Sequence, residues 1–279
     1  MKAEFSAFSL SYIFFFIILF TGDIMFDIGD IVTRKSYDHD IVFKITNIRG
    51  KICYLKGISI RLSADSPIED LVKCDNKRIN DDFSPELDEY HTLDRNEYFY
   101  LPGKILHIDA DNEYLEKCLD FYHKNKIKVY GLYLKEEELA DNIKKYLEMY
   151  NPDILVITGH DAFFRKERNR THYKNTDNFV NAIKEARKYE KSHEKLLIVA
   201  GACQSNYEEL IKAGANFASS PKRINIHALD PAIIAGSLAF SDKSKSINLI
   251  NILEKTKYGS DGVGGIITNG TMYVGYPRE

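Results

Sequence analysis

From residue 104 onwards, short apolar runs alternate with segments whose apolar residues recur at helical spacing. Runs of this length, rich in β-branched residues, are typical of strands buried on both faces of a parallel sheet. The alternation therefore predicts an α/β fold, with a mostly parallel sheet flanked by helices. The apolar runs, with the residues that end them, are 105–108, 128–133, 152–161, 195–205, 215–218 and 224–227, and the predicted helices are 112–124, 137–150, 176–191, 206–213, 230–240 and 247–258.

Two local signals refine this part of the chain. Asp230 followed by Pro231 is typical of an N-cap with proline at the first helical position. The stretch 265–274 alternates around Asn269-Gly270, which predicts a terminal hairpin with an Asn-Gly turn.

The pattern differs before residue 75. Strands of four or five residues are expected at 31–34, 41–45, 52–55 and 58–62, separated by turn-rich breaks. They predict a small antiparallel, SH3-like β-barrel over residues 25–74, most simply a docking or stabilising module. Residues 75–101 are polar and acidic without sustained periodicity, which indicates a linker, and residues 102–279 form the α/β domain.

Residues 1–24 are a doubtful hydrophobic extension. Their apolar centre, 12–20, is short for a membrane span, and the flanking residues match a signal peptide poorly. Met25 directly opens the well-patterned barrel, so we interpret it as the natural start. No stable membrane insertion is expected.

Charge and cysteine content narrow the function classes. The formal net charge of −3 over 279 residues gives no basic excess, so no nucleic-acid partner is expected. The four cysteines form no CxxC pair and are too few for a disulfide framework, which favours a reducing, cytoplasmic compartment. We expect neither a metal nor an organic cofactor.

The candidate chemistry lies where two neighbouring apolar runs end. His160 follows one run and Cys203 follows another. Because parallel strands carry their functional loops at the carboxyl edge, an imidazole and a thiol are expected at the same edge. Cys203 is also expected at a tight strand-to-helix turn, where helix amides favour a thiolate. The pair predicts a nucleophile with its acid or base partner.

Other interpretations stay open. Cys203 alone is compatible with simple packing, and His160 with a loop or capping role. Residues 201–205 also approximate a nucleophile elbow of a glutamine amidotransferase-like hydrolase, in which His227 would be the partner. A non-enzymatic α/β binding module with an SH3-like adaptor is the third alternative, although no glycine-rich phosphate motif is present.

Three motifs together resemble one peptidase family. Residues 158–162 (TGHDA) and 201–205 (GACQS), preceded by 29–37 (GDIVTRKSY), are similar to the YabG family of sporulation-specific peptidases, over nearly the whole chain from Met25. An apolar strand ending in histidine and a later one ending in Ala-Cys also resemble the wider clan of caspase and hemoglobinase-type cysteine peptidases.

The resemblance implies a caspase-like peptidase domain and a cysteine endopeptidase of the sporulating cell. Its partners would be spore coat and germination-related proteins, and association with the spore coat is implied. Cys203 would be the nucleophile, His160 the general acid, and the backbone amides of Asp161 and Cys203 the oxyanion hole. The wider clan usually has glycine where this chain has Asp161.

Several members of that clan cleave after arginine, and a buried guanidinium needs a carboxylate partner. Four aspartates follow strand ends and are candidates for substrate binding, although Asp111 and Asp230 are also candidate helix caps. The planar fork of arginine favours Arg over Lys. The candidate carboxylates are Asp109, Asp111, Asp161 and Asp230, and the candidate self-cleavage sites are Arg78, Arg95, Arg165, Arg168 and Arg170.

Overall fold

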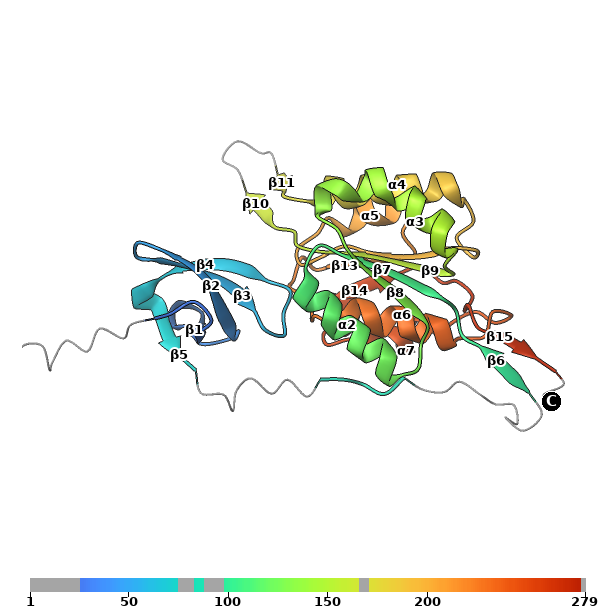
Figure 1. The fold of residues 1–279 in the computed structure, drawn as a ribbon, viewed down its shortest axis with the longest axis horizontal. Coiled ribbons are helices and arrows are strands. Elements are labelled where there is room, and N and C mark those ends of the chain that lie inside the picture. The colour runs from blue at the N-terminus through green and yellow to red at the C-terminus, as the bar shows by residue number, and fades with distance from the viewer. Residues whose placement is uncertain (1–25, 75–82, 88–97, 166–170, 277–279) are drawn as a thin grey trace, which may run out of the picture.

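The computed structural model describes residues 26–74, 83–87, 98–165 and 171–276. Two bodies stand side by side: a small antiparallel β-sheet, and a larger sheet with helices on both faces (Figure 1). The hydrophobic extension 1–24, most of the predicted linker, and Arg78, Arg95, Arg168 and Arg170 lie outside the described residues.

The N-terminal sheet has five strands in the order β4-β3-β2-β1-β5, with antiparallel neighbours. Alternate residues point into one apolar core that includes Val32, Phe43 and Leu55. This agrees with the predicted small antiparallel module. The strands are β1 (Ile31–Arg34), β2 (Phe43–Arg49), β3 (Ile52–Gly57), β4 (Ser63–Pro67) and β5 (Leu71–Lys73).

The predicted strand at 58–62 is wrong. These residues form the loop between β3 and β4, and the strand begins at Ser63, opposite Lys56. The chain turns back on itself here, because Gly57 N donates to Leu62 O at 2.7 Å and Leu62 N to Ile60 O at 2.7 Å. The backbone of this β3–β4 loop is therefore free to pair with a partner outside the N-terminal sheet.

The larger sheet confirms the predicted mostly parallel α/β fold. Its strand order is β14-β13-β12-β9-β7-β8, and every neighbouring pair is parallel except β13 and β14. The strands are β7 (Ile105–Asp109), β8 (Val129–Tyr133), β9 (Ile154–Thr158), β12 (Leu197–Ala200), β13 (Phe217–Ser219) and β14 (Val263–Gly265).

Helices cover both faces of this sheet (Figure 1). Within β12, Leu197 and Val199 pack in the core under α2, α6 and α7, whereas Ile198 and Ala200 pack under α3, α4 and α5. The predicted helices are confirmed with shifted ends, the largest shift being in α7. The helices are α2 (Asn112–Lys124), α3 (Leu139–Tyr150), α4 (Thr176–Tyr189), α5 (Tyr207–Ala213), α6 (Asp230–Phe240) and α7 (Leu249–Glu254).

The predicted terminal hairpin at 265–274 is also wrong. Its first residue, Gly265, ends β14, which pairs with β13, and its second arm ends in β15 (Tyr273–Gly275), which pairs with β6 (Phe99–Leu101) inside the predicted linker. Each arm finds a partner strand elsewhere, so the Asn-Gly step closes no hairpin. The predicted strand at 224–227 is reduced to one bridge, between His227 and Ile60.

After β9 the chain forms a hairpin of β10 (Phe163–Arg165) and β11 (Thr171–Tyr173), which projects from the α/β body (Figure 1). Throughout the described ranges, every helix is too short or too polar to cross a membrane.

Arg187 ties α4 to the loops beneath it and offers a test of this packing. Its guanidinium donates five hydrogen bonds, four of them to backbone carbonyls and one to Asn216 Oδ1. Lysine cannot reproduce this fork, so Arg187→Lys should lower the free energy of unfolding by about 2 kcal/mol. Urea denaturation measures the change, and the exposed Arg49→Lys is the control. Equal stability of the two variants would contradict this role.

Candidate active site

His160 and Cys203 lie at the same edge of the sheet, as predicted. Strands β9 and β12 are parallel neighbours, and Ile157 is paired with Ala200. His160 and Cys203 each follow that pair by three residues. Since neighbouring strands are about 4.8 Å apart, the two loops leave the sheet side by side.

The His160 ring is held by a carboxylate. Its Nε2 lies 2.8 Å from Asp111 Oδ2, and its ring centroid lies 5.8 Å from that of Tyr114. The backbone is fixed as well, because His160 N donates to Glu136 Oε1 at 2.8 Å. Nδ1 is buried and makes no hydrogen bond to any described residue. The ring is therefore oriented through one nitrogen while the other stays available.

Asp111 has two roles that the sequence presented as alternatives. It caps α2 by accepting from the amides of Glu113 and Tyr114, and it also contacts His160 and, at 2.7 Å, Lys56 Nζ. Burial raises the pKa of this carboxyl, but hydrogen bonds from His160 and Lys56 outweigh burial and lower the pKa to about 2. Asp111 is thus ionised beside the imidazole at neutral pH.

The Cys203 thiol is not exposed at a helix end, contrary to the expectation. It is fully buried and packs with Ile226 and Ile60, and α5 begins only at Tyr207. Sγ accepts from Ile226 N at 3.2 Å and shares no hydrogen bond with His160. Burial raises the pKa of the thiol to about 12, although the Ile226 amide and the Arg61 charge oppose the rise. The thiol is protonated in this arrangement.

Asp161 crosslinks the loops around the pair. Its Oδ1 accepts from the amides of Ala162 and Asn175, and its Oδ2 accepts from the hydroxyls of Thr176 and Ser205. Ser205 Oγ in turn accepts from Ala202 N, so the His160 loop is joined to the Cys203 loop. The carboxylate is fully engaged in this network.

Asp109, at the end of β7, faces a charged partner that the sequence analysis missed. Its Oδ2 lies 2.7 Å from Nη2 of Arg61, and both side chains are completely buried. Arg61 Nε also donates to Ala228 O at 3.2 Å, and the guanidinium carbon lies 4.9 Å from the Tyr114 ring centroid. Burial raises the pKa of Asp109, but the Arg61 charge outweighs it and holds the pKa far below its usual range. Arg61 stood in a predicted strand, where nothing distinguished it from a surface arginine.

His227 and Asp230 shape the neighbouring loop. His227 Nδ1 accepts from Leu229 N at 3.1 Å, and its ring meets Phe83 edge-on at 4.8 Å. Asp230 is not the N-cap, which is Leu229; it is buried in the first turn of α6 and accepts from the amides of His227 and Lys257. Burial raises the pKa of Asp230 to about 6. Both side chains organise the loop after residue 226.

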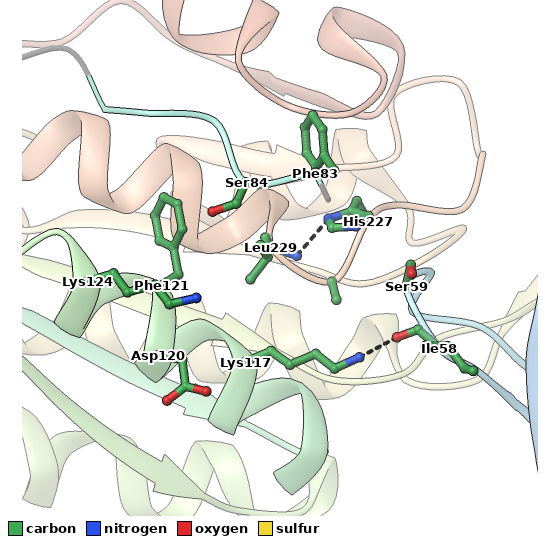
Figure 2. A pocket seen from close by; sticks show the side chains of 11 residues that line it. Ile58, Ser59, Phe83, Ser84, Lys117, Asp120, Phe121, Lys124, His227 and Leu229 are labelled. Atoms are coloured by element: carbon green, nitrogen blue, oxygen red, sulfur yellow. Dashed lines mark hydrogen bonds between the residues drawn. The ribbon is translucent and has the colours of Figure 1, made fainter. Parts of the chain in front are cut away.

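A pocket of about 250 Å³ opens beside this loop, between α2 and the β3–β4 loop (Figure 2). Lys117 Nζ crosses its mouth and donates to Ile58 O at 2.5 Å (Figure 2). Cys203 does not line it. The lining residues are Ile58, Ser59, Phe83, Ser84, Lys117, Asp120, Phe121, Lys124, His227, Ala228 and Leu229.

Comparison with known proteins places this chain among peptidases. The sporulation-specific protease YabG of Bacillus subtilis (strain 168) is 40% identical over 286 residues, which cover 91% of this chain and 99% of the relative. A family model described as YabG peptidase U57 matches residues 27–277. No solved structure matches the chain.

The protein is therefore a peptidase, and thus a hydrolase, associated with sporulation. It belongs to the YabG peptidase U57 family. The resemblance to the YabG family is confirmed, and the interpretation as a non-enzymatic binding module is wrong.

The link between Asp111 and His160 can be tested through stability. Because the folded-state pKa of Asp111 is below its unfolded value of 3.8, its charge stabilises the fold above about pH 4, and this contribution is lost as the pH falls toward 2. Asp111→Asn keeps a good cap, yet should lower the free energy of unfolding by about 2 kcal/mol at pH 7 and by about half as much at pH 3. Urea denaturation at both pH values measures this.

The control for that measurement is Asp120→Asn, an exposed position on the same helix. A wild-type minus Asp111→Asn difference that does not change with pH, or that matches Asp120→Asn, would contradict the proposed ionic contacts.

Proposed function

We propose that the chain is a caspase-like cysteine endopeptidase that cleaves after arginine, with Cys203 as the nucleophile and His160 as the general acid. The observation that carries this proposal is the placement of His160, oriented by Asp111, and Cys203 at equal distances past neighbouring parallel strands. Family membership supplies the reaction class.

The roles follow from the hydrogen bonds. Nε2 of His160 is engaged by Asp111, so Nδ1 is the nitrogen available to protonate a departing amine. Nδ1 of His160 takes the proton of the Cys203 thiol, the resulting thiolate attacks the scissile carbonyl, and the backbone amides of Asp161 and Cys203 stabilise the tetrahedral oxyanion. The carbon–nitrogen bond breaks as the amine takes a proton from His160, and water then hydrolyses the acyl-enzyme and restores the thiol.

Asp109 is the carboxylate that we assign to the arginine pocket. The other three candidates are engaged elsewhere: Asp161 by four donors, Asp230 by two amides, and Asp111 by the α2 cap and His160. Asp109, in contrast, already faces a guanidinium, in a site that also offers Ala228 O as an acceptor. This chemistry supports a preference for arginine at the position before the cleaved bond.

The substrates that we propose are spore coat and germination-related proteins. The peptidase would cleave them in the sporulating cell and at the spore coat. The sporulation-specific protease of Bacillus subtilis is the relative that motivates this setting. The chemistry assigned to Cys203 and His160 uses no metal or organic cofactor.

The amidotransferase-like alternative depends on His227 and has less support. Its Nδ1 already accepts from the Leu229 amide, and its ring packs against Phe83, so its role in this fold is local.

Activity of three variants separates these assignments. Cys203→Ala and His160→Ala should each lower cleavage of a protein substrate by at least about 1000-fold, because nucleophile and acid act as a unit. His227→Ala should retain cleavage. Fragments are mapped by mass spectrometry, and circular dichroism confirms that each variant is folded. Loss of cleavage in His227→Ala together with activity in His160→Ala would transfer the acid role to His227.

The role of Asp109 is best tested without Arg61, because Asp109→Asn alone would leave a buried arginine without its partner. In an Arg61→Ala background, Asp109→Asn should lower kcat/KM for a peptide with arginine before the cleaved bond by about 100-fold and remove its preference over a glutamine peptide. Asp120→Asn in the same background is the control. An unchanged arginine preference would exclude Asp109 from the pocket.

A further inference from the structure

We propose that the β3–β4 loop, residues 58–62, is an intramolecular inhibitor that occupies the substrate cleft and keeps the peptidase latent. This inference rests on the function proposed above. The loop connects β3 and β4 of the N-terminal sheet, but it reaches across to the α/β body and pairs there with His227.

The loop backbone pairs as an extended substrate would. Arg61 N donates to Ile226 O at 3.0 Å, Ala228 N donates to Ser59 O at 2.8 Å, and Ile60 forms an antiparallel bridge with His227. Addition of an extended segment to an exposed backbone edge is a general mode of peptide recognition. The segment 226–228 is therefore the edge that a peptide substrate would use, and the loop already covers it.

The side chain of Arg61 fills the pocket assigned to the substrate arginine. It is completely buried against Asp109, and its Nη2 lies 3.6 Å from Cys118 Sγ. Nη2 is the guanidinium nitrogen that lies 2.7 Å from the carboxylate, whereas Nη1 has no hydrogen-bond partner among the described residues. A substrate arginine and Arg61 would compete for the same charge.

The loop also covers the nucleophile. Ile60 packs directly on Cys203, Leu62 packs against the same cluster, and the thiol is left with no exposed surface. Lys56, at the base of the loop, ion-pairs with Asp111, which orients His160. One hairpin of the N-terminal sheet therefore contacts the groups around both members of the catalytic pair.

The loop is bound as an inhibitor because the chain does not continue as an extended substrate. Leu62 N donates back to Ile60 O at 2.7 Å, so the backbone makes a tight turn centred on Arg61. The Tyr114 hydroxyl secures this turn, because its one proton is shared between Gly57 O at 2.6 Å and Ile60 O at 2.8 Å. At Gly57 a Cβ atom would lie 2.2 Å from Ile60 O, so the turn requires glycine. The peptide bond after Arg61 is thus held in a turn, and resists cleavage while the loop is seated.

The test measures access to Cys203 directly, in a His160→Ala background that prevents self-cleavage under the proposed mechanism. Full-length protein is treated with iodoacetamide, and labelling of each cysteine is followed by peptide mapping. Arg61→Ala, and independently Tyr114→Phe, should raise the rate of Cys203 labelling at least tenfold. Arg49→Ala, an exposed arginine of the same sheet, is the matched control. Cys53, buried in the core of that sheet, reports any general unfolding.

Unchanged labelling of Cys203 in both variants, with Cys53 still protected, would overturn the proposal. If Arg61→Ala also exposes Cys53, that variant has lost its fold, and the result for Tyr114→Phe decides the test. Tyr114→Phe keeps the ring and removes only the hydroxyl contacts to Gly57 O and Ile60 O. If Cys53 and Cys203 are labelled equally faster in Tyr114→Phe, the proposal is also overturned. The Tyr114 hydroxyl would then stabilise the whole fold and not specifically the seated loop.

A second measurement separates this inference from the proposed function. With His160 present, Arg61→Ala and Tyr114→Phe should raise kcat/KM at least tenfold for a fluorogenic peptide with arginine before the cleaved bond, mainly through KM. Faster labelling without peptide cleavage would support the shielding loop and refute the proposed catalysis. Equal peptide cleavage by wild type and both variants would refute the inhibitor and leave the catalysis standing.

Discussion

The ion pair between Arg61 and Asp109 is the constraint on which the arrangement depends. Both groups are removed from water, and a buried charge that loses its partner costs several kcal/mol. Neither side chain can leave the site alone without that cost, so the loop carrying Arg61 stays seated on the edge of the sheet that holds the candidate active site. Its seating also explains why the Cys203 thiol is buried and why its pKa is raised. The pair thus joins the N-terminal sheet to the α/β body through the candidate active site.

The short segment from Asp109 to Tyr114 concentrates the functions of the site. Asp109 holds Arg61, while Asp111 caps α2, orients His160 and binds Lys56. The Tyr114 hydroxyl fastens the β3–β4 loop, and its ring centroid lies 4.9 Å from the guanidinium carbon of Arg61 and 5.8 Å from the centroid of the His160 ring. Strand β7 is paired on both sides, with β9 and β8, so these side chains project from a rigid base. A single strand-to-helix turn therefore carries the groups that we propose for binding the substrate charge, for orienting the general acid and for holding the inhibitory loop.

Much of the fold followed from the sequence, because buried parallel strands and amphipathic helices leave strong local patterns. The alternation from residue 104 predicted the sheet and its helices, including α6 at 230–240. The failures occurred where backbone partners come from distant segments. The apolar stretch 58–62 pairs with residues 226–228 in place of its own sheet, and the two arms of the predicted hairpin pair with β13 and β6. Hydrophobic pattern indicates that a strand can form, but the register and the partner depend on the rest of the chain.

For the site, the sequence by itself determined the positions of His160 and Cys203, because strand ends can be read from local apolar runs and parallel strands share an edge. It also supplied the four aspartates from which Asp109 is chosen. Only the tertiary structure decided what each carboxylate contacts, that the thiol is covered, and that Arg61 is buried. The physical reason is that ion pairs and desolvation depend on atoms brought together from remote parts of the chain. Arg61 and Asp109 are separated by the linker and meet only when the two bodies pack.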